Sequence, residues 1–533
     1  MNRQSIVILL SVFCSMLTFP QSFEQKVEAK FDQPNNIRQY LCKVASDITH
    51  NSLNDIKNLE DWEAVREERH QQFLEMLGLQ GKPFEGKRPP LNVTKTGSIQ
   101  KKGYRIEKLY YESLPGLFVP ANLYIPNGIK KPLPAILYVS GHAHSQKYNY
   151  QAHAKNFAEN GFVCLIIETI QRGEVEGEHL GQESNGWFHW YSRGYNPAGV
   201  EVWNGIRGLD LLSQMPEVDK NNLGVTGISG GGSQSWYLPA ADSRIKAAAA
   251  VAGASSLEGQ IVQKTIDDHC DCMMPINTYG IDFSDIGALI APRPFMIAQP
   301  NRDLYYSIEA VHTLFHKTKP IYSFYGKPEN LIMKDASGGH SYGSKEELRP
   351  EILAFFLKEL KGKNISPDKL GEIDTSLELS EEALKAYVNG VPKDDRTKTI
   401  QDSFVELASP PEINTVEQLD SYKNEVKAFL KEKTFGTFPE KPASLDMRLD
   451  FISSSASGNE RKDYSFVSEE GWRLKLSLQL GQLTDNNQPL LLVLKNPNEE
   501  RYESAALVGG LRGKVIIAYF EARGIGETGW SQS

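Results

Sequence analysis

The sequence predicts an α/β fold, in which a mostly parallel sheet carries helices on both faces and a partial second copy follows. Between residues 134 and 360, short apolar runs alternate with longer helical segments, as in buried parallel strands joined by crossover helices. Polar residues suited to catalysis follow several of these runs. Similar motifs also recur about 354 residues apart, which indicates an internal repeat.

The expected elements follow in chain order. A helix is expected over 62–77, where apolar residues recur at near-helical spacing, and short strands with Gly and Pro turns over 91–126. The continuous apolar runs predict strands over 135–139, 162–167, 223–228, 245–251 and 294–298. The segments between and after them predict helices over 150–160, 200–214, 233–241 and 346–360.

The overall composition is that of a globular protein, with 40% hydrophobic and 23% charged residues. The formal net charge is −9, and no long run of Lys or Arg occurs. Nucleic acids and anionic membrane surfaces are therefore poor partner candidates. The composition leaves the oligomeric state open.

Residues 1–22 are expected to be a signal peptide. Arg3 supplies a positive start, and Ile6 to Phe19 is mostly apolar but too short and interrupted to span a membrane. A short buried or anchor helix is the alternative. We expect a secreted or periplasmic protein with no membrane span.

Three regions are expected after the signal. A catalytic unit with a helical and stranded N-terminal extension takes 23–361, a polar linker takes 362–411, and a second unit takes 412–533. The second unit is expected to be an incomplete copy of the first, because the residue equivalent to Ser229 would fall beyond position 533. Chance similarity is the alternative. The matched pairs are Phe84 with Phe438, Pro134 with Pro489, and Glu168 with Glu521.

Ser229 is the expected nucleophile, in Gly227-Ile-Ser-Gly-Gly. This G-x-S-x-G pentapeptide directly follows an expected strand and precedes an expected helix. A sharp strand-to-helix turn lifts the serine oxygen above the sheet, and its crowded backbone requires glycine. A Gly-rich helix entry or a phosphate-binding loop is the alternative, but the second lacks the Gly-Lys-Ser/Thr ending.

The other two members of a catalytic triad should follow in the order acid, then histidine. Asp303 comes just after the expected strand 294–298, and His340 precedes the last expected helix within a run of small residues. His340 would act as the base and Asp303 would orient it. The competing candidates are Asp335, too early on its strand, and His312 and His316, one helical turn apart.

An oxyanion hole needs two backbone donors. We expect the N–H of Gly230, just after the nucleophile, and the N–H of His142, with that of Ala143 as the second choice. Both come from positions that follow expected strand ends.

The insertion over 169–198 is expected to overhang the cleft. Trp187 and Trp190 are expected to stack on substrate sugar rings, and an aromatic plug that packs the insertion is the alternative. Arg172 is expected near the substrate face, where a salt bridge would brace the site.

A metal site is not expected. Four cysteines remain after the signal: Cys42, Cys164, Cys270 and Cys272. The His269-Cys-Asp-Cys cluster lacks a second pair of ligands, and a zinc pair from His142 and His144 lacks a third ligand. We therefore expect no metal and no cofactor.

These motifs resemble the acetylxylan-esterase-like branch of the α/β-hydrolases, among bacterial carbohydrate esterases. The resemblance covers roughly residues 85–360 and implies the α/β-hydrolase fold. It also implies a serine esterase that removes acetyl groups from plant polysaccharides or oligosaccharides through an acyl-serine. The matching stretches are Ser140-Gly-His-Ala-His, Gln171-Arg-Gly-Glu, Gly199-Val-Glu-Val-Trp-Asn-Gly, Pro216-Glu-Val-Asp, Gly227-Ile-Ser-Gly-Gly-Gly and Ala288-Leu-Ile-Ala-Pro-Arg-Pro.

Two other functions stay open. A serine peptidase of the prolyl-oligopeptidase type shares the fold and the triad order, although no β-propeller repeats precede the domain. A non-catalytic carbohydrate-binding homologue is the other, and the intact set of Ser229, Asp303 and His340 argues against it.

Overall fold

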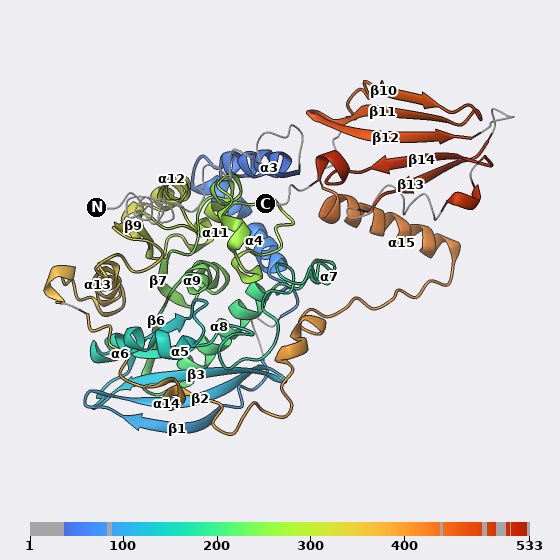
Figure 1. Ribbon diagram of the computed structural model, residues 1–533. Helices are drawn as coiled ribbons and strands as arrows, with labels where there is room; N and C mark the ends of the chain where they lie inside the picture. Colours follow the sequence, from blue (N-terminus) through green and yellow to red (C-terminus); the bar gives the residue numbers. More distant parts are fainter. Residues whose placement is uncertain are drawn as a thin grey trace, which may run out of the picture. The chain divides into compact units, whose positions relative to one another are not determined.

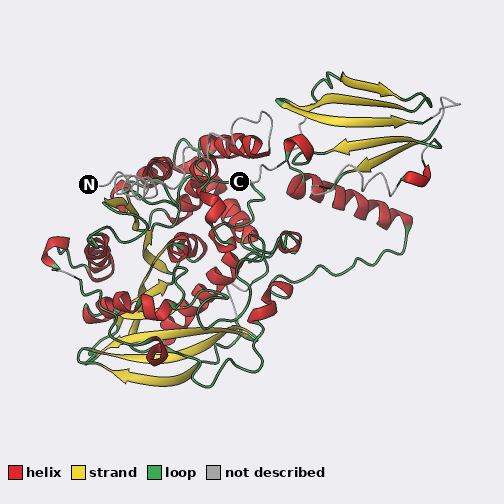
Figure 2. Ribbon diagram, in the orientation of Figure 1, coloured by secondary structure: helices red, strands yellow, loops and turns green. Residues whose placement is uncertain are grey.

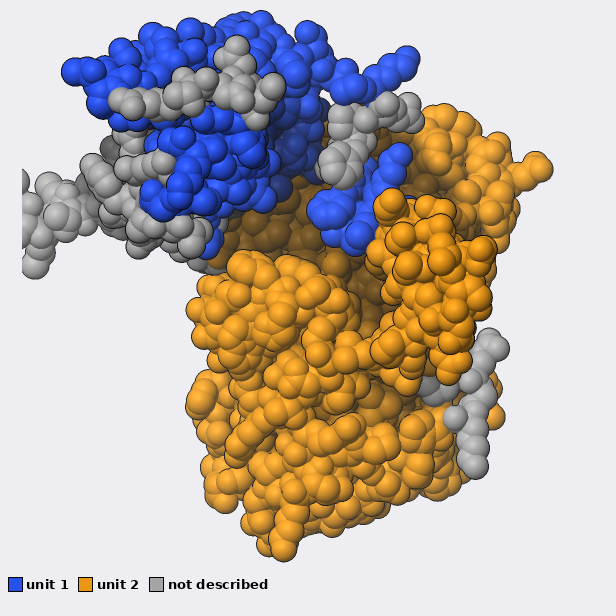
Figure 3. Space-filling view, turned by 90° about the vertical axis from the view of Figure 1, so that its right-hand side faces the viewer, with its two compact units in different colours: residues 1–44, 430–533 blue, residues 45–429 orange. Residues whose placement is uncertain are grey.

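The computed structural model describes residues 37–82, 88–371, 373–436, 441–481, 488–496, 508–511 and 513–529. The chain forms two compact units, residues 45–429 and residues 1–44 together with 430–533 (Figure 3). The expected signal at 1–22, and the repeat pair Phe84 and Phe438, lie outside the described residues. No helix in the described part of the chain is both long and apolar enough to cross a membrane.

In the described part of the 45–429 unit, nine strands form one sheet in the order β1-β2-β3-β5-β4-β6-β7-β8-β9 (Figure 1). The first three strands and β5 pair antiparallel, and every pair from β5 to β9 is parallel. The strands are β1 (Thr94–Gln100), β2 (Tyr104–Leu114), β3 (Leu117–Pro126), β4 (Leu133–Val139), β5 (Val163–Ile167), β6 (Val218–Ile228), β7 (Ile245–Val251), β8 (Phe295–Pro300) and β9 (Leu331–Ala336).

Helices cover both faces of this sheet (Figure 2). The α-helices in the described residues are α3 (Ile37–Asn51), α4 (Leu59–Met76), α5 (Gln146–Asn149), α6 (Gln151–Glu159), α7 (His189–Ser192), α8 (Pro197–Gln214), α9 (Gly230–Ala241), α10 (Leu257–Val262), α11 (Phe283–Ile290), α12 (Ile308–Phe324), α13 (Leu348–Lys361), α14 (Glu381–Leu384) and α15 (Val416–Phe429). The expected helices are confirmed, with their ends shifted by a few residues.

The central strands are apolar on both faces because each face packs on a different set of helices. On β4, Leu137 and Val139 join the core that contains α4, α8, α9, α11 and α12, whereas Ile136 and Tyr138 join the core that contains α6 and α13. Successive side chains of a strand point to opposite faces, so a strand between two helical layers has no polar face. This explains the continuous apolar runs in the sequence.

The expected linker over 362–411 is instead packed within the 45–429 unit. Its buried side chains include those of Leu384, Tyr387, Ile400 and Phe404. Its backbone is also fastened to the loop after β5, because Gln171 Nε2 donates to the Thr397 oxygen at 2.9 Å. The Glu174 carboxylate accepts from the backbone N–H of Ala386 at 2.8 Å and of Tyr387 at 2.6 Å. Composition alone did not reveal this packing, because part of the segment's apolar residues are buried while others, such as Leu377 and Leu407, stay exposed.

The other unit contains, in its described residues, a five-stranded sheet in the order β10-β11-β12-β14-β13. Its β10–β11, β11–β12 and β12–β14 pairs are antiparallel and its β14–β13 pair is parallel, as in β1-β2-β3-β5-β4. The strands are β10 (Arg448–Ser454), β11 (Glu460–Glu469), β12 (Trp472–Leu480), β13 (Leu490–Leu494) and β14 (Ile516–Glu521). The second sheet therefore repeats the topology of the first five strands.

The pairing register also agrees with the repeat. Ala135 pairs with Val163 between β4 and β5, and Leu490 pairs with Ile516 between β13 and β14. These residues differ by the same 355 and 353 positions as the sequence pairs Pro134 with Pro489 and Glu168 with Glu521. Chance similarity of two βαβ units does not account for a shared strand order and a shared register.

Candidate active site

Ser229 lies at the turn between β6 and α9. Its backbone has φ 60° and ψ −123°, a left-handed conformation that costs a non-glycine residue strain. The next turn passes close to β4: a Cβ on Gly231 would lie 2.1 Å from the Val139 carbonyl oxygen. The glycine is therefore required by the close approach of two backbones, and the sequence prediction of a strained elbow is correct.

Asp303 and His340 meet across the loops that follow β8 and β9. His340 Nδ1 donates to Asp303 Oδ2 at 2.8 Å, and the Asp303 side chain is fully buried. The other carboxylate oxygen accepts from the backbone N–H of Tyr305 at 2.8 Å and of Tyr306 at 3.2 Å. These bonds hold the carboxylate in place, so it can fix the orientation and tautomer of the imidazole.

The free nitrogen of His340 is available for catalysis. His340 Nε2 is buried and has no hydrogen-bond partner among the described residues. His340 and Ser229 line one cavity of about 550 Å³, with Tyr305 beside the imidazole at 4.8 Å between ring centroids. The structure thus brings the predicted nucleophile and the predicted base to a common cavity, with Asp303 behind the base.

The loop after β4, which carries the predicted oxyanion donor His142, runs directly beside the nucleophile. A Cβ on Gly141 would lie 3.4 Å from the Ser229 Cβ and 2.6 Å from the Ile228 carbonyl oxygen. A Cβ on Gly230 would lie 2.3 Å from the His142 ring. The loop and the helix start are therefore packed without space between them, and the assignment of the two N–H donors stays a prediction.

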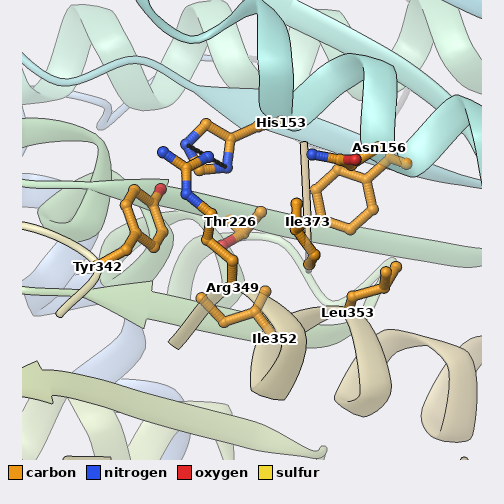
Figure 4. Close-up of a pocket in the computed structure, with 9 residues that line it drawn as sticks. His153, Asn156, Thr226, Tyr342, Arg349, Ile352, Leu353 and Ile373 are labelled. Carbon is orange, nitrogen blue, oxygen red and sulfur yellow. Dashed lines mark hydrogen bonds between the residues drawn. The ribbon is translucent and has the colours of Figure 1, made fainter. Parts of the chain in front are cut away.

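Tyr342, two residues after His340, belongs to a group of packed side chains that includes His153 and Arg349 (Figure 4). Tyr342 packs on the His153 ring at 4.4 Å between centroids, and the Arg349 guanidinium lies 4.6 Å from the Tyr342 ring centre. Arg349 also donates to the His153 ring, and the hydroxyls of Tyr138 and Tyr342 are 2.9 Å apart. Burial lowers the pKa of His153 well below its usual range, so this ring stays neutral and accepts from Arg349.

A second histidine of the cavity, His269, was not predicted to act and has no obvious role in the triad. Burial lowers its pKa to about 4, so it is neutral at neutral pH. Its ring packs on Tyr306 at 5.1 Å and on Tyr305 at 5.7 Å between centroids. It therefore contributes an uncharged wall beside His340.

The predicted substrate-stacking role of the two tryptophans is not what the structure shows. Trp190 is completely buried, and it contacts Tyr195 edge-on at 4.9 Å between centroids. Trp187 packs edge-on against Trp190 at 5.7 Å and is part of the same core. Neither lines the cavity around Ser229. The alternative of an aromatic plug is correct, because a loop of this length needs its own apolar core to hold a shape.

Arg172 does line the cavity, as expected for a residue near the substrate. Arg172 makes no ion pair with any other described residue, so it does not make the salt bridge that was expected to brace the site. Lys147 makes it instead, with Glu168 at 2.8 Å and with Glu174, and all three side chains are largely buried. Lys147 lies on the short helix α5, three residues after the Ser140-Gly-His-Ala-His motif, and no local pattern in the sequence marks its contact with Glu168.

The competing candidates for the triad are elsewhere. Asp335 is exposed on β9. His312 and His316 stack on each other along α12 at 5.9 Å between ring centroids. None of the three lines the cavity that contains Ser229.

The structure brings together a group of four side chains beside the cavity that the sequence did not predict as a group. His142, His179, Cys270 and Cys272 have nitrogen and sulfur atoms that all lie within 4.8 Å of one another. The Cys-x-Cys spacing was visible, but its histidines are 128 and 91 positions from Cys270, so no local pattern links them.

Comparison with known proteins supports the fold. Residues 116–265 match the family described as X-Pro dipeptidyl-peptidase (S15 family). The putative hydrolase YtaP of Bacillus subtilis is 22% identical over 313 residues, covering 56% of this chain and 100% of YtaP. The uncharacterized protein PA2218 of Pseudomonas aeruginosa is 27% identical over 141 residues, covering 26% of this chain and 34% of PA2218.

Among solved structures, Methylesterase BT1017 superposes with a TM-score of 0.50 and 20% identity, covering 75% of this chain and 82% of that chain. A putative acetyl xylan esterase from Bacteroides fragilis has a TM-score of 0.42 and 16% identity, covering 60% of this chain and 82% of that chain. The strand order, the elbow, the chain order of Ser229, Asp303 and His340, and the superposition on Methylesterase BT1017 identify the fold of residues 45–429 as the α/β-hydrolase fold.

Proposed function

We propose that this domain is a serine esterase that removes acetyl groups from plant polysaccharides or oligosaccharides. The observation that carries the proposal is the His340–Asp303 hydrogen bond at 2.8 Å, set behind a cavity that Ser229 also lines. A serine hydroxyl is a weak nucleophile, so a base held by a buried carboxylate is the feature that distinguishes a catalytic serine from a structural one.

The reaction follows from this arrangement. His340 Nε2 takes the proton of the Ser229 hydroxyl as the oxygen attacks the ester carbonyl, which gives a tetrahedral oxyanion. The N–H groups of Gly230 and His142 are the proposed donors to that oxyanion. The C–O bond to the sugar then breaks as the protonated His340 gives its proton to the departing sugar oxygen, and an acetyl-serine remains. His340 next takes a proton from water as the water attacks the acetyl carbon, the bond to Ser229 breaks, acetate leaves, and the proton returns to the Ser229 oxygen.

The substrate assignment rests on resemblance and on the site. The motifs of 85–360 resemble acetylxylan-esterase-like enzymes. The cavity, about 550 Å³ in volume, has space for a sugar unit beside the serine, and Tyr305 and Arg172 on its wall offer an apolar ring face and hydrogen-bond donors. A sugar alkoxide is also a better leaving group than an amide nitrogen, so an ester needs less help from the enzyme.

A peptidase is the second candidate, because residues 116–265 match a family described as X-Pro dipeptidyl-peptidase. That match includes Ser229 but neither Asp303 nor His340. A peptidase of this kind would need a carboxylate in the cavity to bind the free N-terminus of its substrate. Two glutamates on the cavity wall, Glu183 and Glu346, could provide one.

One set of assays tests both candidates. Purified protein should release acetate from acetylated xylooligosaccharides and from a chromogenic acetate ester, and should leave an X-Pro anilide uncleaved. Ser229→Ala should lower the esterase kcat by roughly 10⁴-fold or more. Ser243→Ala, an exposed serine-to-alanine change outside the cavity, is the matched control. Cleavage of the anilide with no release of acetate would favour the peptidase, and full activity in Ser229→Ala would reject a serine hydrolase.

A further inference from the structure

The four-residue cluster beside the catalytic cavity has the composition of a metal site. His142 comes from the loop after β4, His179 from the loop after β5, and Cys270 and Cys272 from the segment that includes the short helix η2 (Asp271–Met273). Two imidazoles and two thiols are the ligand set of many tetrahedral zinc sites. Both cysteines are free, and neither forms a disulfide with another described cysteine.

The distances within the cluster are close to those of a tetrahedral site, and all four ligand atoms lie within 4.8 Å of one another. At ordinary Zn–S and Zn–N bond lengths, ligand atoms lie roughly 3.3–3.8 Å apart. Here the two sulfur atoms are 3.3 Å apart, and His142 Nε2 lies 3.1 Å from Cys272 Sγ and 3.4 Å from Cys270 Sγ. The Nε2 atoms of His142 and His179 are 3.2 Å apart. Side-chain adjustments of up to about 1 Å would therefore bring all four atoms to a single ion.

The orientation of His179 also fits a ligand. Its Nδ1 lies 2.9 Å from the carbonyl oxygen of Ile170, which can only accept, so this nitrogen carries the proton. The lone pair is then on Nε2 and points into the cluster. A backbone carbonyl on the far ring nitrogen is the usual support of a metal-bound histidine.

The cysteine segment is held in place by contacts that need no metal. The Asp271 carboxylate accepts from the backbone N–H of Gln182 at 2.7 Å and of Glu183 at 3.1 Å, just after His179. Asn196 Nδ2 donates to the carbonyl oxygens of Asp271 at 3.2 Å and of Met274 at 2.8 Å. The loop of His179 and the segment of the cysteines are thus joined on both sides of the cluster, which positions the ligands in advance.

We propose that His142, His179, Cys270 and Cys272 bind one zinc ion with a structural role. Four protein ligands leave no open position for water or substrate, which distinguishes a structural from a catalytic zinc. The ion would tie three loops together at the wall of the cavity, and through His142 it would hold the loop that runs beside Ser229. The proposed zinc site does not involve the Ser229 hydroxyl, so its test is independent of the test of the proposed esterase activity.

Metal analysis of the full chain, purified without chelator, tests the proposal directly. We expect about one zinc per chain by elemental analysis. After removal of zinc, titration with Co²⁺ should give the strong visible bands of tetrahedral cobalt and the near-ultraviolet thiolate bands, saturating at one equivalent. A protein with no zinc and no such cobalt spectrum, or with a Cys270–Cys272 disulfide in its mass spectrum, would overturn the proposal. Stoichiometric iron or copper in place of zinc would overturn the choice of metal.

Variants link the ion to its ligands. Cys272→Ser and His179→Gln should each lower the zinc content by at least about tenfold. Cys164→Ala is the matched control, because Cys164 is a buried free cysteine on β5 outside the cluster, and it should keep its zinc. Ser229→Ala should also keep it, which separates this site from the esterase. Zinc retained in both ligand variants would contradict the assignment, and if they fail to fold, the cobalt titration of the unmodified chain still decides.

Discussion

The two sheets of this chain share the order and directions of five strands, and the candidate active site lies in the unit of the first sheet. Strands β1 to β5 and β10 to β14 have the same order, directions and register. In the first sheet β4 also pairs with β6, and the loops after β6, β8 and β9 supply Ser229, Asp303 and His340. In the described residues of the second sheet β13 pairs with β14 alone. The shared strands therefore build a scaffold, and the candidate site of the first unit lies on loops that follow strands outside the shared five.

A glutamate at the end of one strand is a shared structural feature. Glu168 lies beside Gly173 and pairs with Lys147, whereas Glu521 lies beside Gly526 and pairs with Lys495 at 2.7 Å. Both glycines follow their glutamate by five positions and have φ near +60°. Because the same arrangement recurs in the described residues of the second sheet, the glutamate shapes the loop after the strand in both units.

The largest effect on activity is expected from Asp303→Asn, which changes a residue that only the candidate site of the first unit uses among the described residues. An amide in place of the carboxylate would stabilise the wrong tautomer of His340, so kcat for an acetate ester should fall by roughly 10³–10⁴-fold. Steady-state kinetics measure this, with Asp335→Asn as the exposed control on β9. Unchanged kcat in Asp303→Asn would mean that another group orients the base.

The next prediction compares equivalent leucines, Leu137 on β4 and Leu492 on β13, which lie 355 positions apart. Leu137 is fully buried, whereas Leu492 is 53% exposed. Leu137→Ala should lower the free energy of unfolding by about 2–5 kcal/mol, and Leu492→Ala by less than about 1 kcal/mol. Denaturant unfolding followed by local hydrogen exchange would measure both. Equal losses would show that β13 is covered in solution.

A smaller effect is expected from the two equivalent glycines. Alanine at Gly173 or Gly526 would meet the neighbouring glutamate at 2.6 Å and 2.1 Å, and the left-handed backbone adds strain. Each change should destabilise its own unit by roughly 1–3 kcal/mol. Gly173→Ala should also lower esterase activity, and Gly526→Ala should leave it unchanged. Hydrogen exchange locates each loss, and activity lost in Gly526→Ala would contradict the separation of scaffold from site.

The smallest effect concerns alkaline pH and Tyr104, on the antiparallel side of the first sheet. Burial, and then the charge of Glu378, raise the pKa of Tyr104 to about 12 from its usual value near 10. Its contribution to stability is complete below pH 10 and is lost as the pH rises through 12, because the unfolded chain ionises first. Tyr104→Phe should therefore raise the midpoint of alkaline unfolding by a fraction of a pH unit. An unchanged midpoint would mean that other buried tyrosines dominate.

The strands, the helices and the elbow could be predicted because each is encoded locally. An apolar run reports a strand between two helical layers, and Gly227 to Gly231 reports a sharp turn whatever surrounds it. Asp303 and His340 were found because strand ends at one edge of a parallel sheet meet, so chain order alone places them near Ser229. The predictions that Trp190 stacks on a substrate sugar and that 362–411 is a loose linker were wrong. Composition does not say whether a side chain faces solvent or the interior of the protein.

The sequence by itself determined the parallel sheet, the elbow and the repeat, because short-range periodicity and motif spacing reflect burial and turn geometry directly. Only the tertiary structure decided which loops meet beside the cleft. The four residues of the proposed metal site come from three loops and lie up to 130 positions apart in the sequence: His142, His179, Cys270 and Cys272. In the same way, Lys147 pairs with Glu168 from another element. Contacts of that separation depend on the order of strands and the paths of loops, and no local pattern in the chain records them.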